Sequence, residues 1–232
     1  TAAIVVNTPN NPTGAVYGES AMAEFAAIAE QHDAILVSDE VYERFDYAGR
    51  FASALDTGSP NVVVTGAFSK SMAITGARVG YGIFPASAGP ADAPAVDGAT
   101  IVERARTRHM LTNVTGSRPV QYAVSRALEE TPESYYATNR DRMADRIDAF
   151  CAVLDRIGAT YRRPKGAFYV LASLPGVSGS LSDAFDLIDE AGVAAMPGAA
   201  FGEARPDHLR FALLTPRIET AVARLTEYVD SQ

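Results

Sequence analysis

Continuous apolar runs alternate with segments of helical periodicity in the first part of the chain. Residues 20–31 place Met22, Phe25 and Ile28 at helical spacing. The strand-like runs are residues 3–7, 34–38, 61–65 and 78–84. Runs that are apolar on both faces are typical of interior strands. The pattern therefore predicts an α/β architecture with a mostly parallel sheet covered by helices.

The later part of the chain has a different order of predicted helices and strands. A stretch rich in Pro, Ala and Gly at residues 85–98 predicts a loop. The predicted helices beyond it are 99–108, 117–129 and 132–156, then 181–190 and 216–230, with strand-like runs at 166–171, 192–196 and 208–213. Pro132 suits the first position of the long helix. We expect a smaller α+β domain joined through that helix.

Composition removes several classes of function. The chain has 232 residues and a formal charge of −8, with no basic run, which disfavours nucleic-acid binding. No stretch approaches the roughly 20 apolar residues of a membrane-spanning helix. The start at Thr1 reads like a strand entered in mid-domain. The single Cys151 is expected to be a buried thiol in a cytoplasmic protein. The three histidines lack metal-ligand spacing, so no metal site is predicted.

Polar residues follow three of the apolar runs. They are Asn11, Asp39 with Tyr42, and Ser69-Lys70 with Arg78. Ligands of open α/β sheets bind at the carboxyl ends of strands, so these residues are candidates for one site. Each also has an ordinary interpretation, because Asp commonly caps helices, Asn-Pro commonly forms a turn and a loop lysine is commonly solvated.

The lysine segment fits neither of two common lysine motifs. A phosphate-binding P-loop needs glycines immediately before the lysine and six residues before it, where Ser69 and Val64 stand. A Ser-x-x-Lys hydrolase needs serine three residues before the lysine, where Ala67 stands. Lys70 and Lys165 are the two lysines of the chain, so chemistry that needs a primary amine has two candidates.

Six motifs in order resemble the class I and II aminotransferases, which are fold-type I pyridoxal-phosphate enzymes. The likeness spans essentially the whole chain. The motifs are NTPNNPTG at 7–14, SDEVY at 38–42, FSKSMAITGARVGY at 68–81, KGAFY at 165–169, PGAAFG at 197–202 and HLRF at 208–211. The third includes the family's eight-residue step from Lys70 to Arg78.

The resemblance implies a role for each candidate around pyridoxal 5'-phosphate. Lys70 would carry the cofactor as a Schiff base and shuttle a proton. Asp39 would pair with the pyridine nitrogen, so that the ring can accept electrons. Tyr42 and Asn11 would hydrogen-bond the phenolic oxygen of the ring. Lys70, Asp39 and Tyr42 are thus the implied catalytic residues.

Phosphate and substrate contacts are implied in the same way. Ser69 and Arg78 would hold the cofactor phosphate. Arg210 resembles the arginine that grips the substrate carboxylate with two hydrogen bonds, although its strand could also leave it as a surface charge. Among neighbours, Asn7 is expected to support the backbone and Lys165 to be solvated. Tyr169 is expected either to lie in the core, the interpretation we favour, or to face the substrate.

Departures from the family pattern concern the phosphate and the large domain. Ala67 stands where relatives carry a phosphate-binding serine. Residues 1–130 would form a partial cofactor-binding domain, 131–157 a connecting helix and 158–232 a small C-terminal domain. The resemblance implies an incomplete large domain that lacks an N-terminal part of the site, in a longer protein that forms a homodimer.

Transamination between an amino acid and a 2-oxo acid is the leading function that the resemblance implies. The same motifs serve other pyridoxal-phosphate reactions, namely β-elimination, decarboxylation and ring closure. A third alternative is a sensor or interaction domain that kept the fold without catalysis. The identity of the amino-acid donor is not encoded in these motifs, because an arginine such as Arg210 recognises any α-carboxylate.

Overall fold

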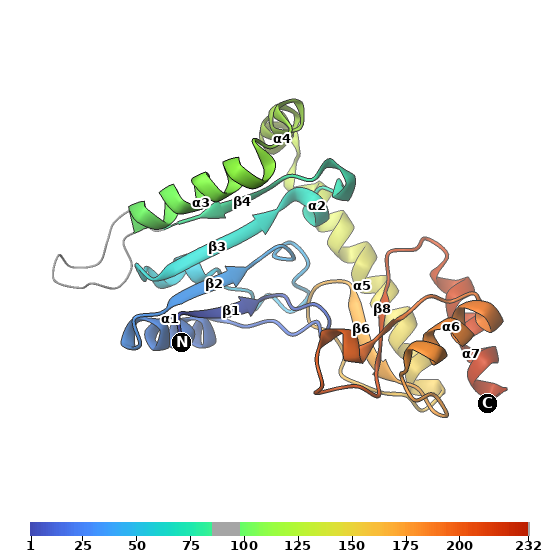
Figure 1. The fold of residues 1–232 in the computed structure, drawn as a ribbon. Coiled ribbons are helices and arrows are strands. Elements are labelled where there is room, and N and C mark those ends of the chain that lie inside the picture. Colours follow the sequence, from blue (N-terminus) through green and yellow to red (C-terminus); the bar gives the residue numbers. More distant parts are fainter. Residues whose placement is uncertain (85–97, 232) are drawn as a thin grey trace. The chain divides into compact units, whose positions relative to one another are not determined.

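The computed structural model describes residues 1–84 and 98–231, so the expected loop at 85–98 lies outside the described residues except for its last position. The chain folds into two compact units, coloured by sequence in Figure 1. The first unit combines Thr1–Pro9 with Val16–Tyr136, and the second combines Asn10–Ala15 with Ala137–Gln232.

A four-stranded sheet forms the centre of the first unit (Figure 1). Its strands, in spatial order, are β1 (Ala3–Asn7), β2 (Ile35–Asp39), β3 (Val62–Ala67) and β4 (Gly80–Ile83). The first three strands run parallel and β4 is antiparallel to β3. The mostly parallel sheet that the sequence predicts is thus confirmed, with an antiparallel edge strand added.

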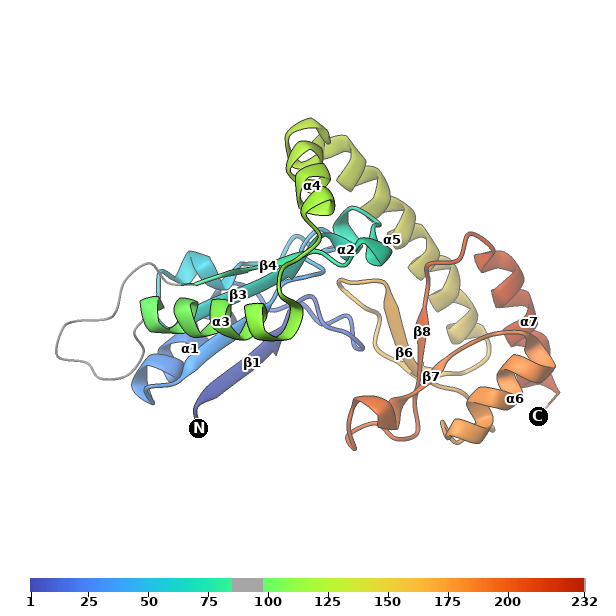
Figure 2. The same ribbon diagram turned by 45° about the horizontal axis from the view of Figure 1, so that its top comes forward.

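Helix α1 (Glu19–Gln31) covers one face of this sheet, as Figures 1 and 2 show. Its small and apolar positions pack onto alternate residues of the strands. The buried cluster consists of Val6, Met22, Ala26, Ala29, Leu36, Ala54, Val62 and Val64. Burial of this apolar surface is the main favourable term for the unit, at roughly 25 cal/mol per Å² removed from water.

Short helical turns and two longer helices complete the first unit. The turns are η1 (Ala54–Thr57), α2 (Phe68–Ser71) and η2 (Thr75–Ala77), and the helices are α3 (Gly98–Asn113) and α4 (Arg118–Glu130). The turns were not predicted, because three or four residues are too few to establish a periodicity. Turn α2 contains the Ser69-Lys70 pair, one of the candidate site segments.

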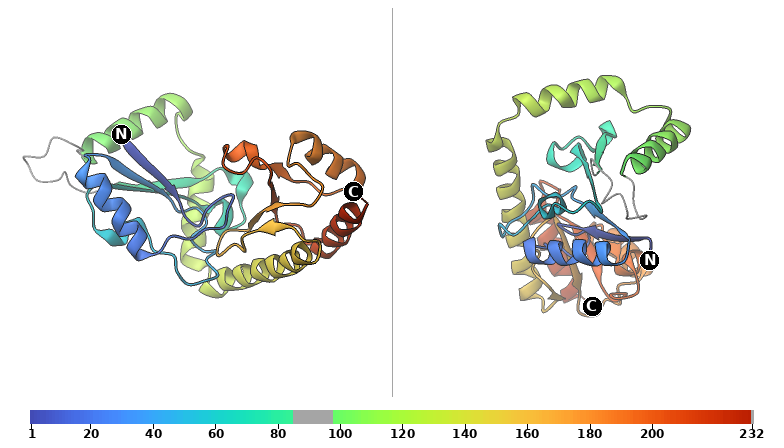
Figure 3. Two further views of the ribbon diagram at one scale, coloured as in Figure 1. Left: turned by 90° about the horizontal axis from the view of Figure 1, so that it is seen from below. Right: turned by 90° about the vertical axis from the view of Figure 1, so that its left-hand side faces the viewer.

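The second unit contains an antiparallel sheet and helices (Figure 3). The strands in spatial order are β5 (Thr160–Tyr161), β6 (Tyr169–Ser173), β8 (Leu209–Ala212) and β7 (Met196–Pro197). The helical elements are α5 (Glu133–Arg156, whose first residues belong to the first unit), α6 (Leu181–Ala191), η3 (Gly198–Phe201) and α7 (Ile218–Asp230). This mixture confirms the α+β texture expected for the second half.

Helix α5 supplies one side of the core of the second unit. The ring of Phe150 lies 5.0 Å from that of Phe211 on β8, measured between centroids. Helix α6 packs against α7 (Figure 3). A capping box starts α6, because the hydroxyl of Ser180 accepts from the amide of Asp183 and the Asp183 carboxylate accepts from the amide of Ser180. Within the described part of the chain, no helix is long and apolar enough to cross a membrane.

Backbone geometry explains where the strand boundaries differ from expectation. The run at 192–196 yields only the two-residue β7, because Gly192 ends α6 in a left-handed conformation with φ 64°. The run at 166–171 becomes a strand only from Tyr169, since Ala167 also has positive φ, at 58°. Helix α3 extends beyond the predicted 99–108, and α7 begins two residues after Pro216.

We expect the substitution Leu36→Ala to lower the free energy of unfolding by about 2–5 kcal/mol. Leu36 is fully buried between α1 and the sheet, so truncation leaves a cavity there. Urea denaturation measures the difference. The matched control is Leu181→Ala, a leucine that is 62% exposed and whose truncation should change stability by less than about 0.5 kcal/mol. Equal effects of the two substitutions would contradict this description of the core.

Candidate active site

The carboxyl ends of the three parallel strands lie in register. Asn7 of β1 is opposite Asp39 of β2, and Asp39 is opposite Thr65 of β3. The side-chain amide of Asn7 donates to the backbone carbonyl of Asp39 at 3.0 Å, which confirms its expected backbone role. The amide of Thr8 donates to the same carbonyl at 3.0 Å. The carbonyl of Asp39 is therefore held by two donors at the end of β1.

Asp39 has a half-buried side chain. Its Oδ1 accepts a hydrogen bond from the amide of Val41 at 3.2 Å. Burial raises the pKa of this carboxyl above its ordinary value, and the bond from Val41 offsets only part of that rise. A desolvated carboxylate in this state gains stability from a cationic hydrogen-bond donor.

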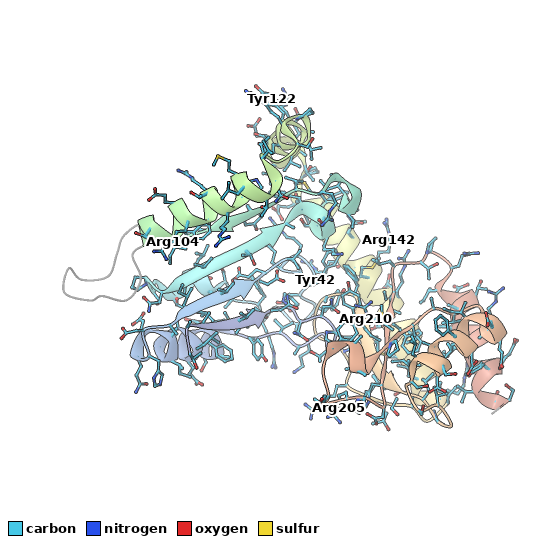
Figure 4. The ribbon with its side chains drawn as sticks, in the orientation of Figure 1. Tyr42, Arg104, Tyr122, Arg142, Arg205 and Arg210 are labelled. Carbon is cyan, nitrogen blue, oxygen red and sulfur yellow. The ribbon has the colours of Figure 1, made fainter. Side chains whose placement is uncertain are left out.

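Tyr42 and Lys70 meet beside the end of the sheet. Tyr42, labelled in Figure 4, follows β2 in a turn and is only 4% exposed. Lys70 is half-buried in α2, directly after β3. Its Nζ lies 6.0 Å from the centroid of the Tyr42 ring. Two candidates that are 28 positions apart in sequence are therefore neighbours, because β2 and β3 are adjacent strands.

Ser69 and Arg78 flank the segment that leads from α2 to β4. Ser69 is buried, and its carbonyl accepts from the hydroxyl of Thr75 at 3.0 Å. Arg78 is exposed and donates through Nη1 to the carbonyl of Thr75 at 2.8 Å. Its backbone is left-handed, with φ 54°, a conformation that costs a non-glycine residue free energy and is often kept at functional sites. Ala67 precedes α2 and gives it no side-chain cap.

In the second unit, a tight turn presents Asn11. The amide of Asn10 donates to the carbonyl of Ala15, and the amide of Gly14 donates to the carbonyl of Asn10, both at 2.8 Å. Gly14 has φ +67°, and a Cβ there would lie 2.1 Å from the Cβ of Pro164. Only glycine satisfies both demands, so the close approach of this turn to Pro164 depends on Gly14.

The guanidinium of Arg210 on β8 contacts two aromatic rings. The central carbon of its guanidinium is 4.6 Å from the centroid of Tyr169 and 4.8 Å from that of Phe201. Its Nη1 donates to Oδ1 of Asn11 at 3.1 Å, across 199 positions of sequence. Figure 4 labels Arg210 and also Arg205, which is exposed. These contacts exclude the alternative of a plain surface charge.

One donor of Arg210 has no acceptor among the described residues: its Nε is buried without a hydrogen-bond partner. An unsatisfied buried donor costs roughly 1–3 kcal/mol of folding free energy, so few such atoms persist in native structures without a function or a bound partner. The flanking rings fix the plane of the guanidinium. A planar carboxylate is the chemical group that matches an arginine held in this way.

Phe201 and Glu40 were not identified from the sequence. Tyr169 is buried, as the favoured expectation has it, and its ring also contacts the guanidinium of Arg210, as does the ring of Phe201. Phe201 lies in the PGAAFG motif, which is the signal that could have identified it. Glu40, which is 3% exposed, was hidden inside the SDEVY motif between two stronger candidates.

Two further residues lie as the sequence predicts. Lys165 is exposed, and the thiol of Cys151 is fully buried. Burial raises the pKa of the Cys151 thiol. Among residues 1–84 and 98–231, no three His, Cys, Asp or Glu side chains are placed to hold a metal ion together.

Sequence comparison relates the chain to aminotransferases. The family model described as "Aminotransferase class I and II" matches residues 1–225. A probable aspartate/prephenate aminotransferase of Thermus aquaticus is 33% identical over 98% of this chain. Aromatic-amino-acid aminotransferase 2 of Thermococcus litoralis is 32% identical over 97% of it. The chain spans 56% of the length of each of these two relatives.

Solved structures agree with the sequence comparison. An aromatic aminotransferase from Pyrococcus horikoshii has a TM-score of 0.87 at 30% identity, covering 99% of this chain and 60% of its own. A double mutant of the Thermus thermophilus aspartate aminotransferase has a TM-score of 0.85 at 30% identity, covering 98% of this chain and 56% of its own. The likeness confirms the fold that the sequence motifs implied.

We expect Asp39→Asn to stabilise the protein when it is prepared without ligands. The raised pKa means that the folded state disfavours the ionised carboxylate, so Asp39 lowers stability at pH 7. That penalty disappears as the pH falls through the raised pKa towards the ordinary value of 3.8. Urea unfolding at pH 7 and at pH 4, close to that ordinary value, should show a gain that shrinks at the lower pH. Asp141→Asn, whose side chain is 73% exposed, is the control and should show no such trend.

Proposed function

Because the chain belongs to the family of class I and II aminotransferases, whose members depend on pyridoxal phosphate, we propose that the intact protein is an aminotransferase. It would move an amino group from an amino acid to a 2-oxo acid. The observation that carries the proposal is the pairing of Lys70 with Tyr42 at the end of the parallel strands that also carry Asp39. This combination supplies the amine, the phenol and the carboxylate that the SDEVY and FSKS motifs contribute in the family.

The residues of the first unit suit pyridoxal phosphate chemically. The half-buried carboxylate of Asp39, with its raised pKa, suits a protonated ring nitrogen that would relieve its desolvation. Lys70 would hold the cofactor through its amine, and the hydroxyl of Tyr42 would donate to the phenolic oxygen of the ring. Ser69 and Arg78 would hold the phosphate, the latter by charge-assisted hydrogen bonds. Asn11 of the second unit is proposed as a second partner of the phenolic oxygen.

The bound cofactor supplies an electron sink for the carbanion that forms when an amino acid loses its α-proton. Lys70, once its amine is released, would accept that proton and return it, a general acid–base role typically worth about 10²–10⁴ in rate. Asp39 would remain ionised beside the ring nitrogen and keep that nitrogen protonated. We propose Lys70, Asp39 and Tyr42 as the catalytic residues.

Arg210 is proposed as the residue that binds the substrate α-carboxylate. Support comes from its unpartnered Nε and from the rings of Tyr169 and Phe201, which contact the guanidinium. Asn11 occupies one Nη1 donor and so fixes the orientation of the remaining donors. A carboxylate would satisfy the buried Nε and pair with the positive charge.

The proposal extends to the organisation of the protein. We propose residues 1–130 as part of a cofactor-binding domain, 131–157 as a connecting helix and 158–232 as a small C-terminal domain. The intact protein is proposed to be a cytoplasmic homodimer, as the resemblance to the family implies. Apolar side chains on α3 and α4 that are more than half exposed, among them Leu111 and Tyr122, are consistent with a further partner surface.

The first experiment reduces the intact protein with borohydride in the presence of pyridoxal phosphate and maps the labelled peptide. We expect the label on Lys70, and we expect Lys70→Ala to lower turnover by at least about 10²-fold. Lys165→Ala is the matched control, because Lys165 is the only other lysine of the chain and is exposed. A label on Lys165, or none, would overturn the proposal.

Product analysis in the same preparation separates the possible reactions. A 2-oxo acid formed without ammonia supports transamination, whereas release of ammonia indicates elimination and release of carbon dioxide indicates decarboxylation. A protein that binds the cofactor on Lys70 but turns over no amino acid would be a sensor or interaction domain. Release of ammonia, release of carbon dioxide, or cofactor binding without turnover would each overturn the proposed reaction while leaving the cofactor site intact.

Arg210→Lys tests the substrate site. Lysine keeps the charge but loses the planar pair of donors, so kcat/KM should fall roughly 10- to 100-fold, chiefly through a higher KM. Steady-state kinetics with a monocarboxylic amino acid measures the change. Arg205→Lys provides the control, because Arg205 is exposed and should tolerate the same exchange. An unchanged KM in Arg210→Lys would remove Arg210 from the substrate site.

A further inference from the structure

Glu40 is a buried carboxylate located between two proposed catalytic residues. It is 3% exposed, and Asp39 precedes it while Tyr42 follows two positions later. Removing a carboxylate from water is costly unless hydrogen bonds replace its hydration. Among the residues that the structure describes, the buried polar and charged set contains no other carboxylate. The hydrogen bonds of this buried carboxylate are therefore important for its role.

Three donors satisfy the carboxylate of Glu40. Its Oε1 accepts from the hydroxyl of Ser38 at 2.9 Å and from the amide of Ala54 at 2.8 Å. Its Oε2 accepts from the hydroxyl of Ser53 at 2.8 Å. Hydrogen bonds to an ionised acceptor are stronger than those between neutral groups. The side chain thus joins the end of β2 to the start of η1.

The backbone of Glu40 is fixed as well. Its amide donates to the carbonyl of Thr65 on β3 at 2.9 Å, and its carbonyl accepts from the amide of Glu43 at 2.9 Å. Ala54, the anchor of the side chain, is fully buried in the core cluster beneath the sheet. The turn at residues 40–43 is therefore tied to β3 through its backbone and to the core through Glu40.

Asp39 and Tyr42 depend on that turn for their placement. The carboxylate of Asp39 has a single backbone donor, from Val41 within the turn, and Tyr42 belongs to the turn itself. An apolar residue could fill the volume of Glu40 without the desolvation cost, so a purely packing role does not account for this hydrogen-bonded side chain.

We propose that Glu40 is a positioning residue, whose hydrogen-bonded carboxylate holds the turn that presents Asp39 and Tyr42 to the cofactor. The inference rests on the proposed aminotransferase function and assigns Glu40 no contact with cofactor or substrate. Loss of the network would let the phenol of Tyr42 move away from the phenolic oxygen of the ring. The pH midpoint of the bound cofactor's visible absorption would then rise, because a hydrogen bond to the deprotonated form lowers a pKa.

The experiment titrates cofactor absorption against pH in the intact protein loaded with pyridoxal phosphate. Tyr42→Phe gives the reference shift that follows from complete loss of the phenol. We expect Glu40→Ala to raise the midpoint by at least half of that shift. Glu40→Gln should restore a nearly wild-type midpoint, because its amide oxygen can accept from Ser38 and Ala54 while its amide nitrogen donates to Ser53.

Asp183→Ala controls for loss of stability alone. It removes the capping box of α6 in the second unit, so it should lower the melting temperature without moving the midpoint. If Glu40→Ala lowers the melting temperature but leaves the midpoint unchanged, the positioning role is wrong. Should Glu40→Ala fail to fold, Ser53→Ala and Ser38→Ala, which each remove one donor, decide the matter by the presence or absence of a rise.

The same titration separates the two hypotheses. If the wild-type protein shows no pH-dependent absorption from cofactor attached to Lys70, the proposed function fails and Glu40 has no site to position. If the wild-type protein titrates and Tyr42→Phe shifts the midpoint while neither Glu40→Ala nor the serine variants do, only the inference about Glu40 is overturned.

Discussion

The parallel register of β1, β2 and β3 is the constraint on which the rest of the first unit depends. It places Asn7, Asp39 and Thr65 side by side at one edge of the sheet. Parallel strands must be joined by crossover connections, so the polar residues that end each strand come from distant parts of the chain. The backbone amides and carbonyls at this edge are then used to hold the turns that follow, including the one that contains Tyr42.

Two neighbouring carboxylates at this edge have opposite environments. Glu40 points into the protein and accepts three hydrogen bonds, whereas Asp39 is half-buried and has one backbone donor. Alternation along the end of a strand sends the two side chains to opposite faces. The three hydrogen bonds let Glu40 support the structure, whereas the raised pKa and partial exposure of Asp39 agree with the role proposed for it beside the cofactor. In the second unit, Arg210 combines both features, since its rings and Asn11 fix it while its Nε remains open.

Much of the fold was accessible from sequence because hydrophobic period and local motifs are local properties. The apolar runs predicted β1–β3, and helical spacing predicted α1 and the long α5. The short turns and the reduced β7 were not predictable in this way. Turn α2 is too short for a period, and β7 is limited by the left-handed Gly192, whose effect appears only once α6 has formed. The antiparallel direction of β4 likewise depends on the path of the intervening segment.

For the candidate site, the sequence by itself determined which side chains are present and, through six motifs, the family to which they belong. It could not determine that Tyr169 and Phe201 enclose Arg210, or that Ser53 and Ala54 satisfy Glu40. Those contacts join residues 9 to 41 positions apart, so no local period encodes them. Only the tertiary structure decided them, because the packing of strands and turns sets which donors meet a buried charge.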